Sequence, residues 1–215
     1  MPAAVEDLRE RLAPPPGAFA PVEPLPVPPP LDGLFPRGGL SRGSVVAVEG
    51  SVWLALALAA GASAAGSWCA VVGLPTLGAA AAEEVGIDLE RLVLVPSPGQ
   101  QWATTVAALL DGFDVVIVRP TAQLKAGEAR RLAARARERR GVIVAIGSWP
   151  DAVDTRLRVV DAEWAGLHAG YGRIAARLAN IAAQGRGAAA RERRVAATLP
   201  ELGPVPLRRP AVATA

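Results

Sequence analysis

The chain has 215 residues, one cysteine and a formal net charge of +3, so its length supports one domain with tails and a sizeable core. A single cysteine excludes an intramolecular disulfide framework and a cysteine-based zinc site. The most apolar stretch, residues 52–65, is too short to span a bilayer, and the amino terminus lacks the pattern of a secretory signal, so we expect a cytoplasmic protein.

The first thirty residues predict no core of their own. Residues 2–12 place apolar side chains at helical spacing and predict a short helix that is marginal in isolation. Residues 14–30 are rich in proline and predict an extended spacer. We therefore expect an amino-terminal segment at 1–30, an α/β domain at 31–199 and a disordered tail at 200–215.

The pentapeptide at residues 31–35, Leu-Asp-Gly-Leu-Phe, has two alternative interpretations. It loosely resembles the short Leu/Phe motif with which bacterial polymerases dock to the sliding clamp. Its position just before a glycine turn and the first strand favours packing on the sheet instead.

Strands and helices alternate between residues 44 and 146. Continuous Val, Ile and Leu runs predict strands buried on both faces, and their alternation with helices predicts a mostly parallel central sheet. The expected strands are 44–48, 68–72, 92–95, 115–118 and 142–146, and the expected helices are 52–65, 77–85, 101–110 and 127–139.

After Gly147 the pattern changes to alternating polar and apolar residues, which predicts antiparallel strands with one solvated face. The three candidate strands are 155–164, 173–183 and 193–199. The middle one is ambiguous, because the alanines of 174–183 suit a helix equally well. The fold class is thus α/β, a parallel central sheet flanked by helices with an antiparallel carboxyl-terminal extension.

The turn after the first predicted strand is where a nucleotide-binding α/β domain would carry its phosphate loop. Such a loop has several residues between two glycines, a lysine for the β/γ-phosphates and a hydroxyl for Mg²⁺. Here Gly50 and Ser51 run directly into Val52, and the one lysine of the chain, Lys125, lies far downstream. The scaffold of a nucleotide site is present without its phosphate chemistry.

Most of residues 31–165 resemble the core of the RecA recombinase. Residues 38–43 resemble the turn before its first core strand, residues 85–92 with 96–101 resemble a passage between two core strands, and residues 114–118 resemble the strand that carries the Mg²⁺-associated acid. Within this family the chain is most similar to the short ImuA-type proteins of actinobacteria, which belong to the DNA-damage-inducible mutagenesis cassette. Residues 64–75 and 130–139 carry this narrower likeness.

The departures from RecA imply a protein that is not an enzyme. Arg119 stands where the family has its Mg²⁺-linked aspartate, and Gly73-Leu74-Pro75 stand where RecA carries a catalytic glutamate. Phosphate cradle, metal acid and water-activating carboxylate are missing together, so we expect no ATP hydrolysis, no cofactor and no metal. A residual nucleotide-gated ATPase remains the alternative, because arginine also binds phosphate.

The resemblance implies an accessory role in translesion synthesis during the DNA-damage response. The implied partners are the Y-family polymerase homologue of the cassette and a damage-inducible C-family polymerase, with association to the nucleoid on damage. Contact with DNA and self-association are further candidates, and no membrane partner is expected.

Basic residues gather between positions 119 and 140, where eight stand against two acidic ones. One interpretation is a solvated helix face with Glu128–Arg131 and Arg135–Glu138 ion pairs. The other is a surface for DNA or an acidic partner. The candidate surface residues are Lys125, Arg130, Arg131, Arg135, Arg137, Arg139, Arg140, Arg193 and Arg194.

Two residues that occur once each have structural interpretations. Cys69 lies in an apolar strand pattern and is expected to be a buried small hydrophobe. His168 lies among glycines without an identifiable partner and is expected in a turn.

Overall fold

The computed structural model describes residues 22–120, 124–151, 153–168 and 171–199. The predicted helix at 2–12 and the predicted disorder at 200–215 lie outside these residues. The inner strands are β3 (Val45–Glu49), β4 (Cys69–Val72), β5 (Leu92–Val95), β6 (Val115–Val118) and β7 (Val142–Ile146). The later strands are β8 (Thr155–His168), β9 (Tyr171–Gly185) and β10 (Arg193–Leu199). The longer helices are α3 (Val52–Ala64), α4 (Ala79–Glu84), α5 (Trp102–Leu109) and α6 (Ala126–Arg139).

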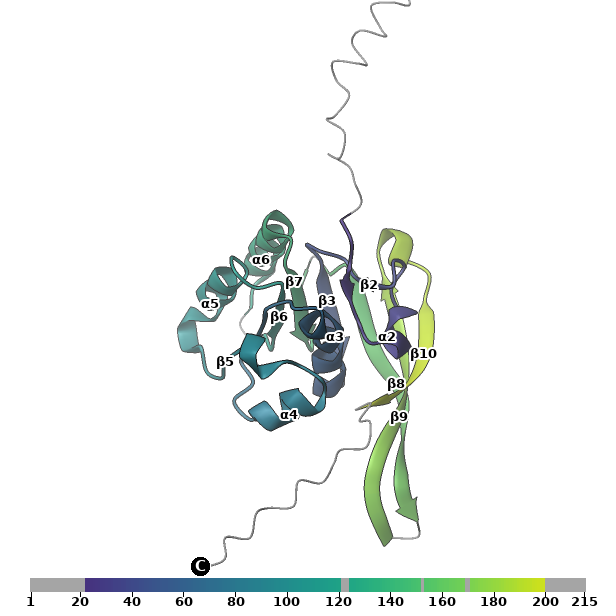
Figure 1. Cartoon of the computed structure of the whole chain (residues 1–215). Coiled ribbons are helices and arrows are strands. Elements are labelled where there is room, and N and C mark those ends of the chain that lie inside the picture. Colours follow the sequence, from purple (N-terminus) through teal and green to yellow (C-terminus); the bar gives the residue numbers. More distant parts are fainter. Residues whose placement is uncertain (1–21, 121–123, 152, 169–170, 200–215) are drawn as a thin grey trace, which may run out of the picture.

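These strands form one sheet in the order β10-β9-β8-β3-β7-β6-β4-β5 (Figure 1). Every pairing from β8 across to β5 is parallel, whereas β9 pairs antiparallel with both β8 and β10. The predicted class, a mostly parallel sheet flanked by helices with an antiparallel carboxyl-terminal region, is confirmed. Outside the β8–β9 hairpin, the bounds of the predicted elements agree with the structure to within two residues.

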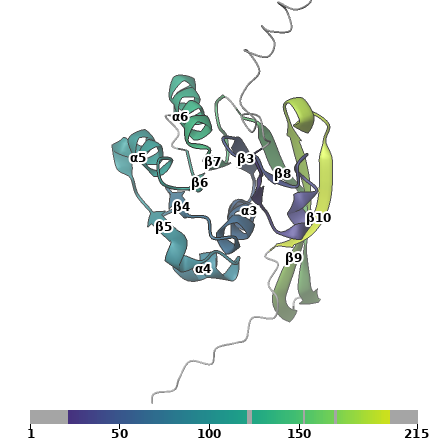
Figure 2. The same cartoon turned by 45° about the horizontal axis from the view of Figure 1, so that its top comes forward.

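Helices cover both faces of the sheet, so the fold has two cores (Figure 2). Successive strand residues point to opposite faces. In β3, Val46 and Val48 join the core beneath α3, while Val45 and Ala47 join the core beneath α5 and α6. This explains why the inner strands are apolar at every position. None of the described helices is long and apolar enough to cross a membrane.

Part of the proline-rich segment belongs to the core, so the prediction of a spacer is wrong for residues 22–30. The short strand β1 (Leu25–Pro26) pairs antiparallel with β2 (Gly39–Leu40), and Leu25 and Val27 are buried against the α3 side of the sheet. A Cβ atom on Gly61, in the last turn of α3, would lie 2.7 Å from the Pro26 carbonyl oxygen and from Val27 Cα. The glycine thus lets this segment lie directly on the helix.

The pentapeptide at 31–35 packs on the sheet, as predicted. The short helix α2 (Pro29–Asp32) contacts β10, and Leu31, Leu34 and Phe35 are buried in the α3-side core. A Cβ atom on Gly33 would lie 3.2 Å from Val195 Cγ1 of β10. Because its apolar side chains are covered, this segment is not presented as a clamp-docking peptide.

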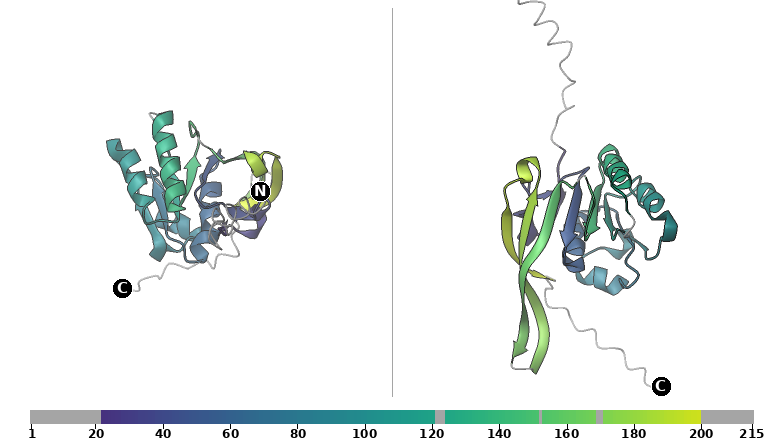
Figure 3. Two further views of the ribbon diagram at one scale, coloured as in Figure 1. Left: turned by 90° about the horizontal axis from the view of Figure 1, so that it is seen from above. Right: turned by 180° about the vertical axis from the view of Figure 1, so that it is seen from behind.

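The β8–β9 hairpin is longer than predicted and projects beyond the body of the domain (Figure 3). Strand β3 pairs with β8 only over Thr155–Arg158, and β10 pairs with β9 only over residues 177–183. The rest of the hairpin is a two-stranded ribbon with register shifts after Val159 and after Ala165. The ambiguous segment 174–183 is therefore strand, and His168 ends β8, paired with Tyr171 beside the turn.

Cys69 is fully buried in β4, as predicted. Burial, together with the nearby Asp114 carboxylate, raises the pKa of its thiol to about 12. Because the thiolate is the reactive species, we expect Ellman's reagent to leave the native chain unlabelled and to label one thiol per chain in denaturant. Rapid labelling of the native chain would contradict this packing.

Candidate functional site

Parallel strands bring their carboxyl ends to one edge of the sheet, where ligands bind in open α/β sheets. Three of the residues singled out in the sequence lie at this edge. Gly50 follows β3, Gly73 follows β4 and Arg119 follows β6. The structure therefore places the Gly50-Ser51 turn and Arg119 at the same edge, with β7 between their strands.

The turn after β3 is a helix cap. Gly50 has a positive φ of 80°, and Ser51 is the N-cap of α3, which begins at Val52. The Ser51 hydroxyl oxygen accepts a hydrogen bond from the Leu54 backbone N–H at 3.1 Å, and the residue is buried. The Ser51 hydroxyl, which follows the first strand as the Mg²⁺-binding hydroxyl of a phosphate loop would, therefore caps the helix.

The backbone of Arg119 is fixed and its side chain is exposed. Its N–H donates to the Val72 carbonyl at 2.9 Å, and its carbonyl accepts from Trp102 Nε1 at 3.1 Å. A Cβ atom on Gly73 would lie 3.0 Å from that carbonyl oxygen, so the two loops are close together. Leu74, which stands in the region of the glutamate of RecA, is buried in the α3-side core.

Acidic residues do not gather at this edge. Within the described part of the chain, no three His, Cys, Asp or Glu residues lie together as metal ligands would. Glu49, at the end of β3, forms an ion pair with Arg156 of β8 at 2.9 Å. At this edge lie a turn that caps a helix and an exposed guanidinium group. These groups are better suited to binding an anion than to binding Mg²⁺.

A cavity of about 330 Å³ lies beside this edge, between the first turns of α5 and α6. Lys125, Glu128, Gln100 and Trp102 contribute to its lining. Glu128 Oε2 accepts a hydrogen bond from the Lys125 backbone N–H at 3.1 Å, which caps the start of α6. The one lysine of the chain is thus exposed at the amino-terminal end of α6.

The basic helix α6 forms its ion pairs with residues outside the helix. The Glu128–Arg131 and Arg135–Glu138 ion pairs of the first interpretation are not among the ion pairs of the described residues. Its buried face is the predicted set of Ala129, Leu132, Ala133 and Ala136. On the outer face, Arg135 and Arg139 both contact Asp111, which follows α5, at 2.6 Å and 3.1 Å. Arg130 contacts Asp151 at 2.7 Å. Three of the candidate cations are therefore partly neutralised by acids.

The remaining candidate cations do not form one surface. Arg131 and Arg140 are exposed on α6 and have no ion pair with a described residue. Arg193 and Arg194 lie on β10, an edge strand of the sheet, where Arg194 contacts Glu192 at 2.6 Å. Helix α6 contacts β7, near the middle of the strand order, so the basic residues singled out in the sequence lie in two separate places.

The pKa of Asp111 is held below its usual value of 3.8, mainly by hydrogen bonds from Arg135. Stability from this contact is therefore present above about pH 3.8 and is lost as the pH falls through the lower folded-state value. We expect Asp111→Asn to lower the melting temperature slightly at pH 6, with the difference from the unaltered chain shrinking towards pH 2.5. Glu84→Gln, which removes an exposed carboxylate on α4, is the matched control and should show no such trend.

Residues 33–151, more than half of the chain, match the family described as the MT3502 N-terminal domain. The chain belongs to the MT3502 N-terminal domain family. It is also 38% identical over 128 residues to the uncharacterized protein Rv3395c of Mycobacterium tuberculosis. That alignment covers 58% of this chain and 62% of the relative, so the chain spans less than two thirds of the relative's length.

The MT3502 N-terminal domain region contains the helical and parallel part of the fold. It runs from β2 through β7 and includes Gly50, Ser51, Gly73, Arg119 and the whole of α6. Strands β8, β9 and β10, which form the antiparallel pairs at one side of the sheet, lie beyond it.

Proposed function

We propose that this chain is a non-catalytic RecA-like adaptor of the ImuA type in DNA-damage-induced translesion synthesis. It acts by contacts with the Y-family polymerase homologue of the mutagenesis cassette and with a damage-inducible C-family polymerase. The proposal rests on which groups lie at the carboxyl ends of the parallel strands. There the Ser51 hydroxyl caps α3, and Arg119 occupies the position that resembles the metal acid of RecA.

The mycobacterial relative supports the narrower resemblance, because it comes from the actinobacterial lineage in which ImuA-type proteins occur. The name of that relative assigns it no activity. The adaptor role therefore rests on the RecA-like sequence segments, the α/β sheet and the chemistry of the strand edge.

The β8–β9 ribbon is the strongest candidate for a partner-binding surface. Beyond its pairing with β3 and β10 it contributes no strand contact to the body, so the fold does not require its length. Val160 and Leu178, two of the exposed large apolar residues, lie at its base, Leu178 within the part of β9 that pairs with β10. A protruding ribbon with accessible backbone edges is suited to pairing with another protein.

The proposal is tested with the purified chain and the purified Y-family homologue by biolayer interferometry. We expect a complex that forms equally well with and without ATP and Mg²⁺. A matched variant shortens the ribbon by replacing residues 166–175 with Asn-Gly, which joins the cross-strand pair Ala165 and Ala176 by a two-residue hairpin turn and keeps the residues of β9 that pair with β10. This variant should keep the melting temperature of the unaltered chain and bind the polymerase homologue more weakly.

The absence of a complex with either polymerase would refute the adaptor proposal. A complex that forms only with ATP would favour the alternative of a nucleotide-gated switch. Equal binding by the shortened variant would show that the polymerase homologue contacts the body of the domain and not the ribbon.

A further inference from the structure

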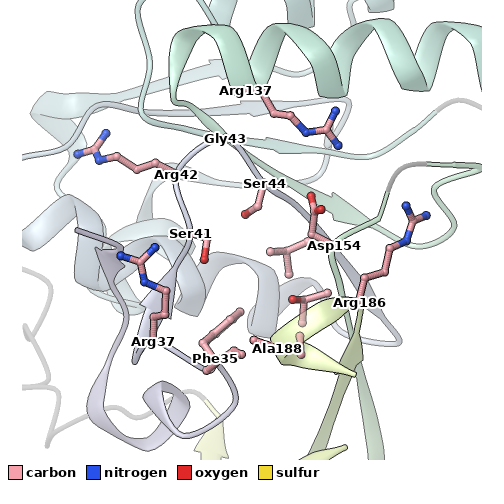
Figure 4. A pocket seen from close by; sticks show the side chains of 14 residues that line it. Phe35, Arg37, Ser41, Arg42, Gly43, Ser44, Arg137, Asp154, Arg186 and Ala188 are labelled. Atoms are coloured by element: carbon pink, nitrogen blue, oxygen red, sulfur yellow. The ribbon is translucent and has the colours of Figure 1, made fainter. Parts of the chain in front are cut away.

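A second cavity, of about 350 Å³, lies at the opposite edge of the sheet from Gly50 and Arg119 (Figure 4). It is built where β3 and β8 begin, beside the last turns of α6 and the end of β9. Ser44 and Asp154 come from the strand starts, Arg137 from α6, and Arg186 from the residue after β9. None of these four residues belongs to the strand edge discussed above.

The floor of the cavity contains a buried hydroxyl without a partner. Ser44 is 8% exposed, and its buried Oγ forms no hydrogen bond with any described residue. Figure 4 shows this side chain pointing into the space between Ser41 and Asp154. Buried polar groups are almost always hydrogen-bonded, so the bonding capacity of this hydroxyl is left for a ligand, which it reaches by rotation about χ1.

Two guanidinium groups flank the cavity without ion pairs to any described residue. In Figure 4 Arg137 lies above Asp154 and Arg186 to the right of it, and both arginines are exposed. The Asp154 carboxylate is occupied in part by the backbone, because its Oδ2 accepts from the Val45 N–H at 2.8 Å. The two cations therefore outnumber the one carboxylate between them.

Arg37 and Arg42 complete the basic rim but are already engaged. Arg42 points away from the cavity to Asp114 at 2.8 Å, and Arg37 donates to the Val22 carbonyl at 2.9 Å. Their positive charge still adds to the potential at the cavity mouth. The opposite wall is apolar, with Phe35, Val46 and Ala189.

We propose that this cavity binds a phosphate group that carries an organic substituent. Arginine presents paired N–H donors that fit phosphate oxygens, which favours Arg137 and Arg186 as the binding groups. A volume of about 350 Å³ exceeds the need of a bare phosphate and falls in the range of small-molecule sites. The apolar wall takes the substituent. Free nucleotides and the backbone of a nucleic acid share this chemistry.

The test uses the full chain and three probes: inorganic phosphate, deoxyadenosine monophosphate and a fluorescein-labelled single-stranded oligonucleotide. Calorimetry measures the first two and fluorescence anisotropy the third, each at two salt concentrations. The double variant Arg137→Ala/Arg186→Ala should bind about tenfold more weakly or not at all. Arg158→Ala/Arg191→Ala removes the same charge from exposed positions outside the cavity and is the matched control.

Two conservative variants separate binding from folding. Ser44→Ala should keep the melting temperature and weaken binding, because the hydroxyl has no protein partner to lose. Asp154→Asn should strengthen binding, because it removes the one repelling charge and keeps an oxygen for the Val45 N–H.

Binding of the mononucleotide without the oligonucleotide would identify a free phosphorylated ligand. Binding of the oligonucleotide that the cavity variant loses would identify a nucleic-acid backbone. The proposal is overturned if none of the probes binds, or if the cavity and control double variants lose binding equally. These outcomes are independent of the polymerase contacts, so either proposal can fail alone.

Discussion

Gly61→Ala is expected to lower the free energy of unfolding by about 1–3 kcal/mol, although alanine is the better helix former. The new methyl group would lie 2.7 Å from backbone atoms of Pro26 and Val27, which cannot move aside as a flexible side chain would. Either the segment around β1 separates from α3 or the helix shifts in the core. Urea denaturation followed by circular dichroism measures the change.

The control is Gly127→Ala in α6, where a Cβ atom would meet nothing within 4 Å. Here only the helix propensity changes, so we expect stabilisation by up to about 1 kcal/mol. The two substitutions are chemically identical and should have opposite signs. If both stabilise the chain, the amino-terminal segment does not lie on α3 as described.

Leu34→Ala is expected to lower the free energy of unfolding by about 2–5 kcal/mol, as for other buried leucines. Leu34 is 1% exposed and belongs to the core that β10, α2 and α3 share. Removing its isobutyl group leaves a cavity between α2 and the sheet. The same denaturation experiment provides the value.

Leu89→Ala is the matched control, because Leu89 is 38% exposed on a short 3-10 turn. A change within about 0.5 kcal/mol is expected there. A similarly small change for Leu34→Ala would contradict the packing of this segment and revive the clamp-docking interpretation of residues 31–35.

The inner sheet was predictable because its signal is local. Strands β4, β6 and β7 are short runs of Val, Ile, Ala and Cys, and burial on both faces admits no polar residue. The helix α6 was predictable for the opposite reason, since its alanines and one leucine fall on one face and its arginines on the other.

The elements that were mispredicted depend on distant partners. The proline-rich residues around Leu25 become core only because Gly61 lets them approach α3. In β9, alanines that favour a helix in isolation are held as strand by pairing with β8 and β10. The ion pairs of α6 were misassigned because Asp111 reaches Arg135 from the turn after α5, 24 positions away in the sequence.

Of the two sites, only the strand edge had a sequence signature. The Gly50-Ser51 turn and Arg119 were found because a known motif is missing at that position. The second cavity is lined by residues from separate segments, among them Ser44, Arg137, Asp154 and Arg186, so no sequence spacing predicts it. Its strongest sign, an unpartnered buried hydroxyl, exists only in three dimensions.

The measurement that most directly tests the central claim is release of phosphate from ATP in the presence of Mg²⁺. We expect no phosphate release above the rate in buffer, because the strand edge has a helix cap at Ser51 and a cation at Arg119 in place of the groups that would bind Mg²⁺. Mg²⁺-dependent release by the unaltered chain that Ser51→Ala or Arg119→Ala abolishes would contradict it.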